Sequence, residues 1–273
     1  NHIADPSKED NMRDLMAAVV ANQADFGIGF DSDGDRSGFV TNAGRMFGGN
    51  ELLMLLAKSR LNSQAYLDKG AYVVTDSPAS YAVEEVVTAN TGNYDLWKAG
   101  YVYIKQRMDE LESEGKTICF GGETTGHIMF PENNNFDDGT YTAAVIVTFL
   151  ANSTQTLQET LDALPNKSLG YSMNEPIGME IYPGIPEDKK PETLRQVKED
   201  LTHEVEAIYL ARGNQVKFTD GARITFTDQQ GNWLGWGLVR ASLSKPILTL
   251  TIEGRDPAAH LEIAYDIIQT LST

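Results

Sequence analysis

The chain of 273 residues is long enough for two domains or one large one, and its 41% hydrophobic and 22% charged residues are ordinary for a globular protein. Its 22 Lys and Arg against 39 Asp and Glu give a net charge of -17, which argues against nucleic-acid or anionic-membrane partners, since both require basic surface. No apolar run approaches the roughly 20 residues of a membrane span, and no signal peptide is visible.

The number of cysteines indicates whether the protein works in an oxidising or a reducing environment. Cys119 is the one cysteine, so an internal disulfide is ruled out and a reducing, cytoplasmic environment is expected. It lies in an apolar run, residues 117–120, which favours a buried and unreactive thiol over a nucleophile.

Up to residue 150 the hydrophobic pattern alternates between strand and helix periods. Helices are predicted at 7–22, 50–59, 79–89, 102–113 and 138–150. Strands are predicted at 25–30, 37–41, 71–75, 93–98 and 117–120. This alternation predicts an α/β fold, with a three-layer α/β/α domain around a mainly parallel sheet.

After residue 152 the pattern changes. Five prolines between 165 and 191 indicate a domain boundary and a loop. Beyond them, helices are predicted at 192–211 and 257–271, and strands at 216–218, 222–227, 233–240 and 247–253. Strands bracketed by helices in this way predict a small α+β C-terminal domain.

The first candidate site is the run Gly27-Ile-Gly-Phe-Asp-Ser-Asp-Gly-Asp-Arg36. Asp31, Asp33 and Asp35 occupy alternate positions after an apolar strand, so their carboxylates could converge on one divalent cation. Arg36 adds a fixed charge that suits a phosphoryl group. A metal and an arginine at the end of a strand indicate chemistry on phosphate.

Three alternatives compete for this loop. A calcium loop of the EF-hand kind requires Gly at Arg36 and Glu at Asn42, so it fails twice. A solvated acidic turn is a second alternative. A phosphatase of the haloacid dehalogenase type is the sharpest, because Phe30-Asp-Ser-Asp-Gly34 fits its motif, although Asp35 replaces the usual threonine. There the first aspartate would be a nucleophile beside one metal.

The second candidate site is the loop Gly121-Gly-Glu-Thr-Thr-Gly-His127, which follows a predicted strand. Open α/β sheets bind ligands at the carboxyl ends of their strands. A carboxylate and a hydroxyl here could bind adjacent sugar hydroxyls, and His127 is a candidate proton carrier near neutral pH. The alternative is a structural turn with a capping threonine.

The third candidate site is the segment Val239-Arg-Ala-Ser-Leu-Ser-Lys-Pro246, between two predicted strands. Its polar groups could bind a phosphate together with the backbone amides of the loop: Arg240, Ser242, Ser244 and Lys245. The alternative is an ordinary hairpin with a solvated lysine.

Taken together and in this order, the three segments resemble the α-D-phosphohexomutase superfamily, the phosphoglucomutases and phosphomannomutases. The resemblance extends from Asn1-His-Ile through Phe136-Asp-Asp-Gly139 to Glu253-Gly-Arg255. It implies four domains around one cleft, of which this chain would contain the end of the second with the metal loop (1–41), the third with the sugar-binding loop (42–155) and the fourth with the phosphate-binding loop (165–273).

The resemblance also implies roles for the candidate residues. Mg²⁺ would bind Asp31, Asp33 and Asp35, and Arg36 would face the transferring phosphoryl group. Glu123 and Thr125 would bind the sugar hydroxyls of glucose or mannose. Arg240, Ser242 and Ser244 would bind the non-reacting phosphate. Lys98-Ala-Gly-Tyr101 would be a further substrate-contacting loop; Tyr101 stands where many members have histidine, which leaves His127 as the proton-transfer candidate.

The resemblance implies interconversion of hexose 1-phosphate and hexose 6-phosphate through a phosphoserine and a hexose bisphosphate. The family's phosphoserine lies in a Thr-x-Ser-His-Asn-Pro loop of its first domain, which these 273 residues do not match. We therefore expect this chain to be the C-terminal part of such an enzyme. We also expect it to be inactive without the N-terminal phosphoserine domain. A non-catalytic sugar-phosphate-binding fragment and the phosphatase remain as alternatives.

Overall fold

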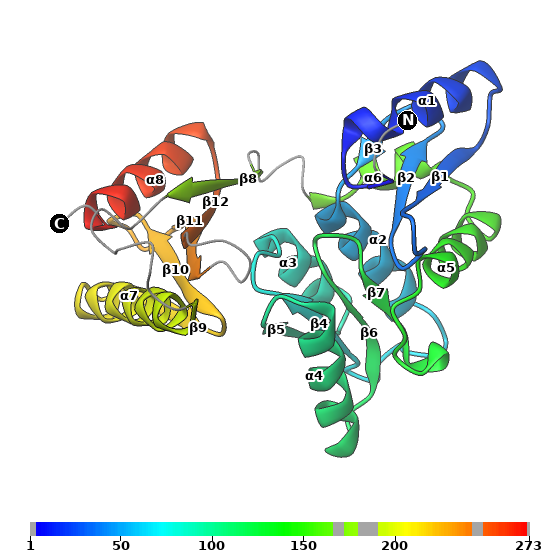
Figure 1. Cartoon of the computed structure of the whole chain (residues 1–273). Helices are drawn as coiled ribbons and strands as arrows, with labels where there is room; N and C mark the ends of the chain where they lie inside the picture. The colour runs from blue at the N-terminus through cyan, green and yellow to red at the C-terminus, as the bar shows by residue number, and fades with distance from the viewer. Residues whose placement is uncertain (1–3, 166–171, 180–190, 242–247, 272–273) are drawn as a thin grey trace. The chain divides into compact units, whose positions relative to one another are not determined.

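The computed structural model describes residues 4–165, 172–179, 191–241 and 248–271 (Figure 1). The chain divides into two compact units, Asn1–Lys167 and Ser168–Thr273, each with its own hydrophobic core. Among the helices in these described ranges, none has both the length and the hydrophobicity that a membrane span needs.

The first unit begins with helix α1 (Glu9–Ala21) and an antiparallel sheet in the order β1-β2-β3. The strands of this sheet are β1 (Phe26–Phe30), β2 (Ser37–Thr41) and β3 (Met46–Phe47). Glycines in β1 let α1 approach closely, since a Cβ at Gly27 would lie 2.6 Å from Val19 and one at Gly29 would lie 2.8 Å from Met12. The candidate metal loop connects β1 to β2, so both of its ends are fixed by strand pairing.

The centre of the first unit is a four-stranded sheet in the order β5-β4-β6-β7, parallel except for β7. Its strands are β4 (Tyr72–Asp76), β5 (Asn93–Trp97), β6 (Ile118–Gly122) and β7 (Ile128–Met129). The helices around it are α2 (Gly49–Leu61), α3 (Tyr81–Ala89) and α4 (Tyr101–Ser113).

Helices cover both faces of this sheet (Figure 1). A Cβ at Gly121 would meet Ile104 and Met108 of α4, whereas one at the next residue, Gly122, would meet Leu53 of α2. Successive residues of a strand point to opposite faces, so α4 and α2 lie on opposite sides. The predicted three-layer α/β/α domain with a mainly parallel sheet is thus confirmed.

Two further helices complete the unit, α5 (Gly139–Ala151) and α6 (Leu157–Asp162). Asp138 caps α5, because its carboxylate accepts a 2.9 Å hydrogen bond from the amide of Tyr141. Helix α5 contacts β1 and β2 of the first sheet and β7 of the second, so it connects the two sheets. Helix α6, which the sequence analysis did not predict, begins with a capping box of Thr156 and Glu159.

The second unit is an antiparallel sheet in the order β8-β12-β11-β10-β9 with two helices packed on it. Its elements are β8 (Ser172–Met179), α7 (Pro191–Ala211), β9 (Gln215–Phe218), β10 (Gly221–Thr227), β11 (Trp233–Ala241), β12 (Leu248–Gly254) and α8 (Pro257–Leu271). Val205 and Tyr209 of α7 share one core with Ile263 and Ile267 of α8. The predicted small α+β domain is confirmed.

Strand β8 is the main difference from the expected elements. The proline-rich stretch was expected to be a loop, yet residues 172–179 pair antiparallel with β12 at the edge of the sheet. Pro176 is tolerated there because the pairing shifts register between Leu250 and Ile252, opposite the proline. Edge strands and bulges are where a strand can accept a residue without an amide hydrogen.

Candidate active site

The loop after β1 gathers three carboxylates around one arginine. Ligand oxygens of Asp31, Asp33 and Asp35 lie within 4.8 Å of one another. Asp31 organises the turn: its Oδ1 accepts hydrogen bonds from the amides of Gly34 (3.0 Å) and Arg36 (3.2 Å). Its Oδ2 accepts a 2.7 Å hydrogen bond from Nε of Arg36. Asp31 therefore fixes the guanidinium, whose Nε also lies 3.8 Å from Oδ1 of Asp35.

Asp31 and Asp35 have pKa values shifted in opposite directions. Burial alone would raise the pKa of Asp31, but the hydrogen bonds and charge of Arg36 lower it to about 2. Burial and the adjacent Asp31 carboxyl group raise the pKa of Asp35 to about 6. Carboxylates held this close repel each other, and a bound cation would relieve that repulsion.

The residues of the loop fit a hard divalent cation. All three side chains offer carboxylate oxygens, which are the ligands that Mg²⁺ prefers. Oδ1 of Asp35 is buried and accepts no hydrogen bond from the residues that the structure describes. A buried oxygen without a hydrogen bond destabilises the fold, and Nε of Arg36, 3.8 Å away, is beyond hydrogen-bond distance, so a bound cation would compensate this oxygen more fully.

The second candidate loop follows β6 and contacts the Lys98–Tyr101 segment. Glu123 is buried, and its Oε1 accepts a 2.5 Å hydrogen bond from the amide of Gly100. Lys98 is exposed, with its ammonium 5.9 Å from the centre of the Tyr103 ring. Thr125 is exposed. The structure thus brings together two of the segments in which the sequence analysis placed substrate contacts.

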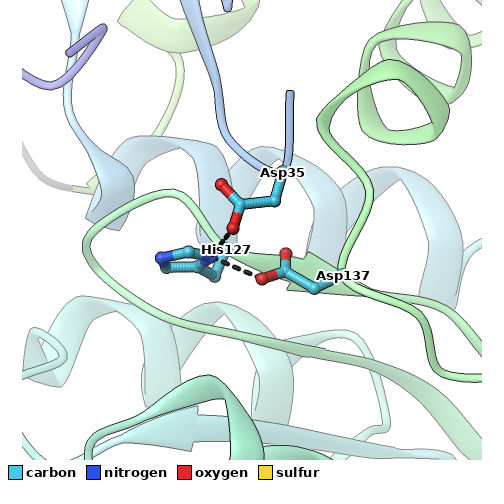
Figure 2. A group of neighbouring side chains, drawn as sticks. All are labelled: Asp35, His127 and Asp137. Atoms are coloured by element: carbon cyan, nitrogen blue, oxygen red, sulfur yellow. Dashed lines mark hydrogen bonds and ion pairs between the residues drawn. The ribbon is translucent and has the colours of Figure 1, made fainter. Parts of the chain in front are cut away.

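His127 ends this second loop and lies against the metal loop. Its backbone forms an antiparallel bridge with Arg36, and its Nδ1 lies 3.9 Å from Oδ2 of Asp35. The ring of Tyr101 stacks on it with centroids 5.5 Å apart. Burial favours the neutral ring, but the hydrogen bond and charge of Asp137 raise the pKa of His127 above its ordinary value. Asp35, His127 and Asp137 form one cluster (Figure 2).

Two acids at this site were given no role in the sequence analysis. Asp137 binds His127, and Asp76 holds the second loop, since its Oδ1 and Oδ2 accept hydrogen bonds from the amide and the hydroxyl of Thr124. Asp76 ends β4, beside β6 in the parallel sheet. An acid at the carboxyl end of a predicted parallel strand was the available signal for Asp76.

The third candidate segment belongs to the second unit. Arg240 is in β11, and its guanidinium forms a 3.2 Å ion pair with Asp220. Ser242, Ser244 and Lys245 lie outside the described residues.

Comparison with known proteins shows the family to which the chain belongs. The model for domain III of phosphoglucomutase/phosphomannomutase, an α/β/α domain, matches residues 48–168, and the model for domain II of the same family matches residues 1–44. The chain is 32% identical over 254 residues to a phosphomannomutase/phosphoglucomutase of Pseudomonas aeruginosa, covering 93% of this chain and 48% of that protein. The chain belongs to the phosphoglucomutase/phosphomannomutase family, within the α-D-phosphohexomutase superfamily.

Solved structures agree with this assignment. A phosphoglucomutase/phosphomannomutase family protein from Burkholderia thailandensis is similar with a TM-score of 0.75 and 28% identity, covering 99% of this chain and 51% of that one. An N-acetylphosphoglucosamine mutase from Aspergillus fumigatus, solved in complex with GlcNAc-6P and magnesium, shares the fold at 14% identity, with a TM-score of 0.56 and coverage of 90% and 49%. The chain spans about half the length of the curated relatives it matches.

Proposed function

We propose that this chain is the part of a phosphohexomutase that binds the metal and the sugar phosphate. The whole enzyme would interconvert hexose 1-phosphate and hexose 6-phosphate, of glucose or mannose, through a phosphoserine and a hexose bisphosphate. The phosphoserine would come from a segment outside these 273 residues. We also propose a cytoplasmic location, with which the buried free thiol of Cys119 agrees.

In this proposal the loop after β1 handles the transferring phosphoryl group. Asp31, Asp33 and Asp35 would hold Mg²⁺, which supplies positive charge to phosphoryl oxygens when it is bound. Arg36, fixed by its hydrogen bond to Asp31, would contribute a second positive charge at a constant position. Phosphoryl transfer depends mainly on positioning of the reacting groups and on stabilisation of their charge, and this loop would provide both.

The loop after β6 and the Lys98–Tyr101 segment would bind the sugar. Glu123 and Thr125 would accept and donate hydrogen bonds to adjacent hydroxyls, while Lys98 and Tyr101 would contact the substrate from the second segment. His127 would exchange protons with the sugar hydroxyl that gains or loses the phosphoryl group. Its stacking on Tyr101 keeps the ring beside the sugar-binding segment.

We propose that the second unit binds the phosphate that does not react. Arg240, Ser242, Ser244 and Lys245 would form that site. The corresponding domain division is 1–41, 42–155 and 165–273.

The observation that supports this function most directly is the backbone bridge between Arg36 and His127. It joins the proposed metal loop to the proposed sugar-binding loop, so that a phosphoryl group and a sugar hydroxyl can be held side by side. A dehalogenase-type phosphatase is not favoured, because the family of the chain is the phosphohexomutases.

The test compares Asp33→Asn with Asp25→Asn in a protein that joins this chain to the serine-bearing segment. Both acids are exposed, so neither change should disturb the fold, but only Asp33 belongs to the metal loop. Conversion of glucose 1-phosphate to glucose 6-phosphate with Mg²⁺ and glucose 1,6-bisphosphate should fall about 100-fold or more in Asp33→Asn. Equal activity of the two variants would contradict the proposed metal site.

A further inference from the structure

Asp137 is a nearly buried acid that contacts the His127 ring from a different loop. Its side chain is 9% exposed, and its Oδ2 lies 2.5 Å from Nδ1 of His127. Oδ2 of Asp35 lies 3.9 Å from the same nitrogen. Figure 2 shows that the Nδ1 edge of the ring faces both carboxylates, while the opposite ring nitrogen, Nε2, points away from them.

The chemistry of this pair restricts the proton on the ring. An ionised carboxylate can only accept a hydrogen bond, so Nδ1 must carry the proton whenever the two are paired. In a neutral ring, Nε2 is then unprotonated and is the atom that takes up a proton. A ring without such a partner has no fixed tautomer or orientation.

The backbone around Asp137 is fixed at several points. Asp137 itself forms an antiparallel bridge with Met129. Two residues further, the amide of Gly139 donates a 3.0 Å hydrogen bond to the carbonyl of Gly34 in the metal loop. A Cβ at Gly139 would lie 2.7 Å from the backbone of Arg36, so this approach requires glycine. The carboxylate of Asp137 is therefore held at a set position relative to both His127 and the metal loop.

We propose that Asp137 is a positioning residue for His127. It accepts the Nδ1 proton, fixes the orientation of the ring and leaves Nε2 as the atom that exchanges protons with the sugar phosphate. This inference rests on the proposed function, in which His127 is the proton carrier. Two separate backbone contacts join these residues to the metal loop: His127 pairs with Arg36, and Gly139, two residues after Asp137, donates to Gly34.

The tautomer of His127 can be measured directly in this chain by long-range ¹H–¹⁵N NMR of the imidazole nitrogens, at a pH where the ring is neutral. The chain has four histidines, and loss of one set of signals in His127→Asn assigns those of His127. We expect Nδ1 of the unaltered chain to be protonated and Nε2 to be unprotonated. A ring protonated at Nε2 would overturn the inference, and this result needs no variant of Asp137.

Two alanine variants at adjacent acids then separate positioning from folding. Asp137→Ala should convert the single tautomer into a mixture, since the remaining carboxylate oxygen at Nδ1, Oδ2 of Asp35, is 3.9 Å away and beyond hydrogen-bond distance. Asp138→Ala removes the cap of α5 but should leave Nδ1 protonated. A tautomer unchanged in Asp137→Ala would contradict the inference. If Asp137→Ala does not fold, Asp137→Asn replaces it: its amide can accept from a protonated Nδ1 or donate to an unprotonated one, so the single tautomer should again become a mixture.

Kinetics distinguish this inference from the proposed function. In the protein joined to its serine-bearing segment, Asp137→Ala should lower kcat about 100-fold or more and change KM little, because the ring would no longer be oriented for proton transfer. An unaltered protein without mutase activity would refute the proposed function and leave the tautomer result standing. A variant with unchanged kcat would refute the role of Asp137 alone.

Discussion

The buried carboxylate of Asp76 accepts two hydrogen bonds from Thr124, 3.1 Å from its amide and 2.9 Å from its hydroxyl. Asp76 ends β4 and Thr124 follows β6, so the pair connects two parallel strands at the carboxyl edge of the sheet. Glu123 and Thr125, the residues proposed to bind the sugar, are the neighbours of Thr124. Asp76 thus helps to hold the proposed sugar-binding loop in position.

Asp76→Asn should destabilise the chain and weaken sugar-phosphate binding. The amide oxygen of asparagine can still accept from the Thr124 amide, and its NH₂ can donate to the Thr124 hydroxyl oxygen, but both hydrogen bonds lose the charge of the carboxylate, at a cost of about 1–2 kcal/mol. Urea unfolding of the chain measures this loss. Asp68→Asn is the matched control, because Asp68 is exposed and its φ of 57° suits asparagine. Equal stability of the two variants would contradict the structural role of Asp76.

Gly49→Ala tests the packing of α2 against the loop 121–127, which contains Thr124. Gly49 begins α2, and a Cβ there would overlap the carbonyl oxygen and carbon of Thr124. Backbone atoms must move to relieve such an overlap, so we expect a loss of about 1–3 kcal/mol in the free energy of unfolding. Nothing lies within 4 Å of a Cβ at the preceding residue, Gly48, so Gly48→Ala should lose only the smaller difference between glycine and alanine at the N-cap of α2. Similar losses in both variants would contradict this packing.

Asp35→Asn should stabilise the metal-free chain at neutral pH. Burial and the Asp31 carboxyl group raise the pKa of Asp35 to about 6 from an ordinary value of 3.8. As the pH rises, the unfolded chain therefore loses this proton first, and the free energy of unfolding falls between about pH 4 and pH 6. Asparagine carries no charge, so the expected gain at neutral pH is about 1–2 kcal/mol, allowing for the partial exposure of the side chain.

Urea unfolding in a chelator, at several pH values from about 4 to 7, measures this effect as the difference between Asp35→Asn and the unaltered chain. The difference should widen as the pH rises through this window. The pKa of Asp31 is lowered to about 2, so Asp31 titrates below this pH window and does not contribute to the change. Adding Mg²⁺ should stabilise the unaltered chain and not the variant. A difference that is independent of pH would contradict the raised pKa of Asp35.

Paramagnetic Mn²⁺, in place of Mg²⁺, should broaden the NMR signals of the His127 ring at low occupancy. The reason is proximity, since Oδ2 of Asp35 lies 3.9 Å from Nδ1 of His127. Asp33→Asn and Asp35→Asn should each greatly reduce the broadening, whereas Asp25→Asn should leave it unchanged. Undiminished broadening of His127 in both loop variants would show that the metal binds elsewhere.

The sequence predicted the fold well wherever hydrophobic periodicity extends over several residues. The helix at 102–113 and the strand at 71–75, for example, correspond to α4 and β4 within a residue or two. Strand β7 has only two residues and shows no period, and the Pro176 in β8 argues against a strand until the register shift in β12 is known. Short and edge strands are defined by their partners, which a local pattern does not contain.

In the candidate site, too, the sequence predicted what is local and missed what depends on contacts between distant segments. Alternate spacing was enough to group Asp31, Asp33 and Asp35, because they share one loop. The partners of the second loop come from elsewhere in the chain: Asp76 is 48 positions before Thr124, and Asp137 is ten positions after His127. Such contacts follow from strand order and from backbone bridges between loops. Both are tertiary properties, and the sequence pattern does not encode them locally.

We propose that this chain works in phosphoryl exchange on a hexose phosphate and requires a phosphoserine from outside its 273 residues. The most direct measurement is ³¹P NMR of glucose 1-phosphate with Mg²⁺ and glucose 1,6-bisphosphate, using the chain alone and the chain joined to its serine-bearing segment. We predict glucose 6-phosphate from the joined protein and no conversion by the chain alone. Release of inorganic phosphate, or formation of glucose 6-phosphate by the chain alone, would contradict the account.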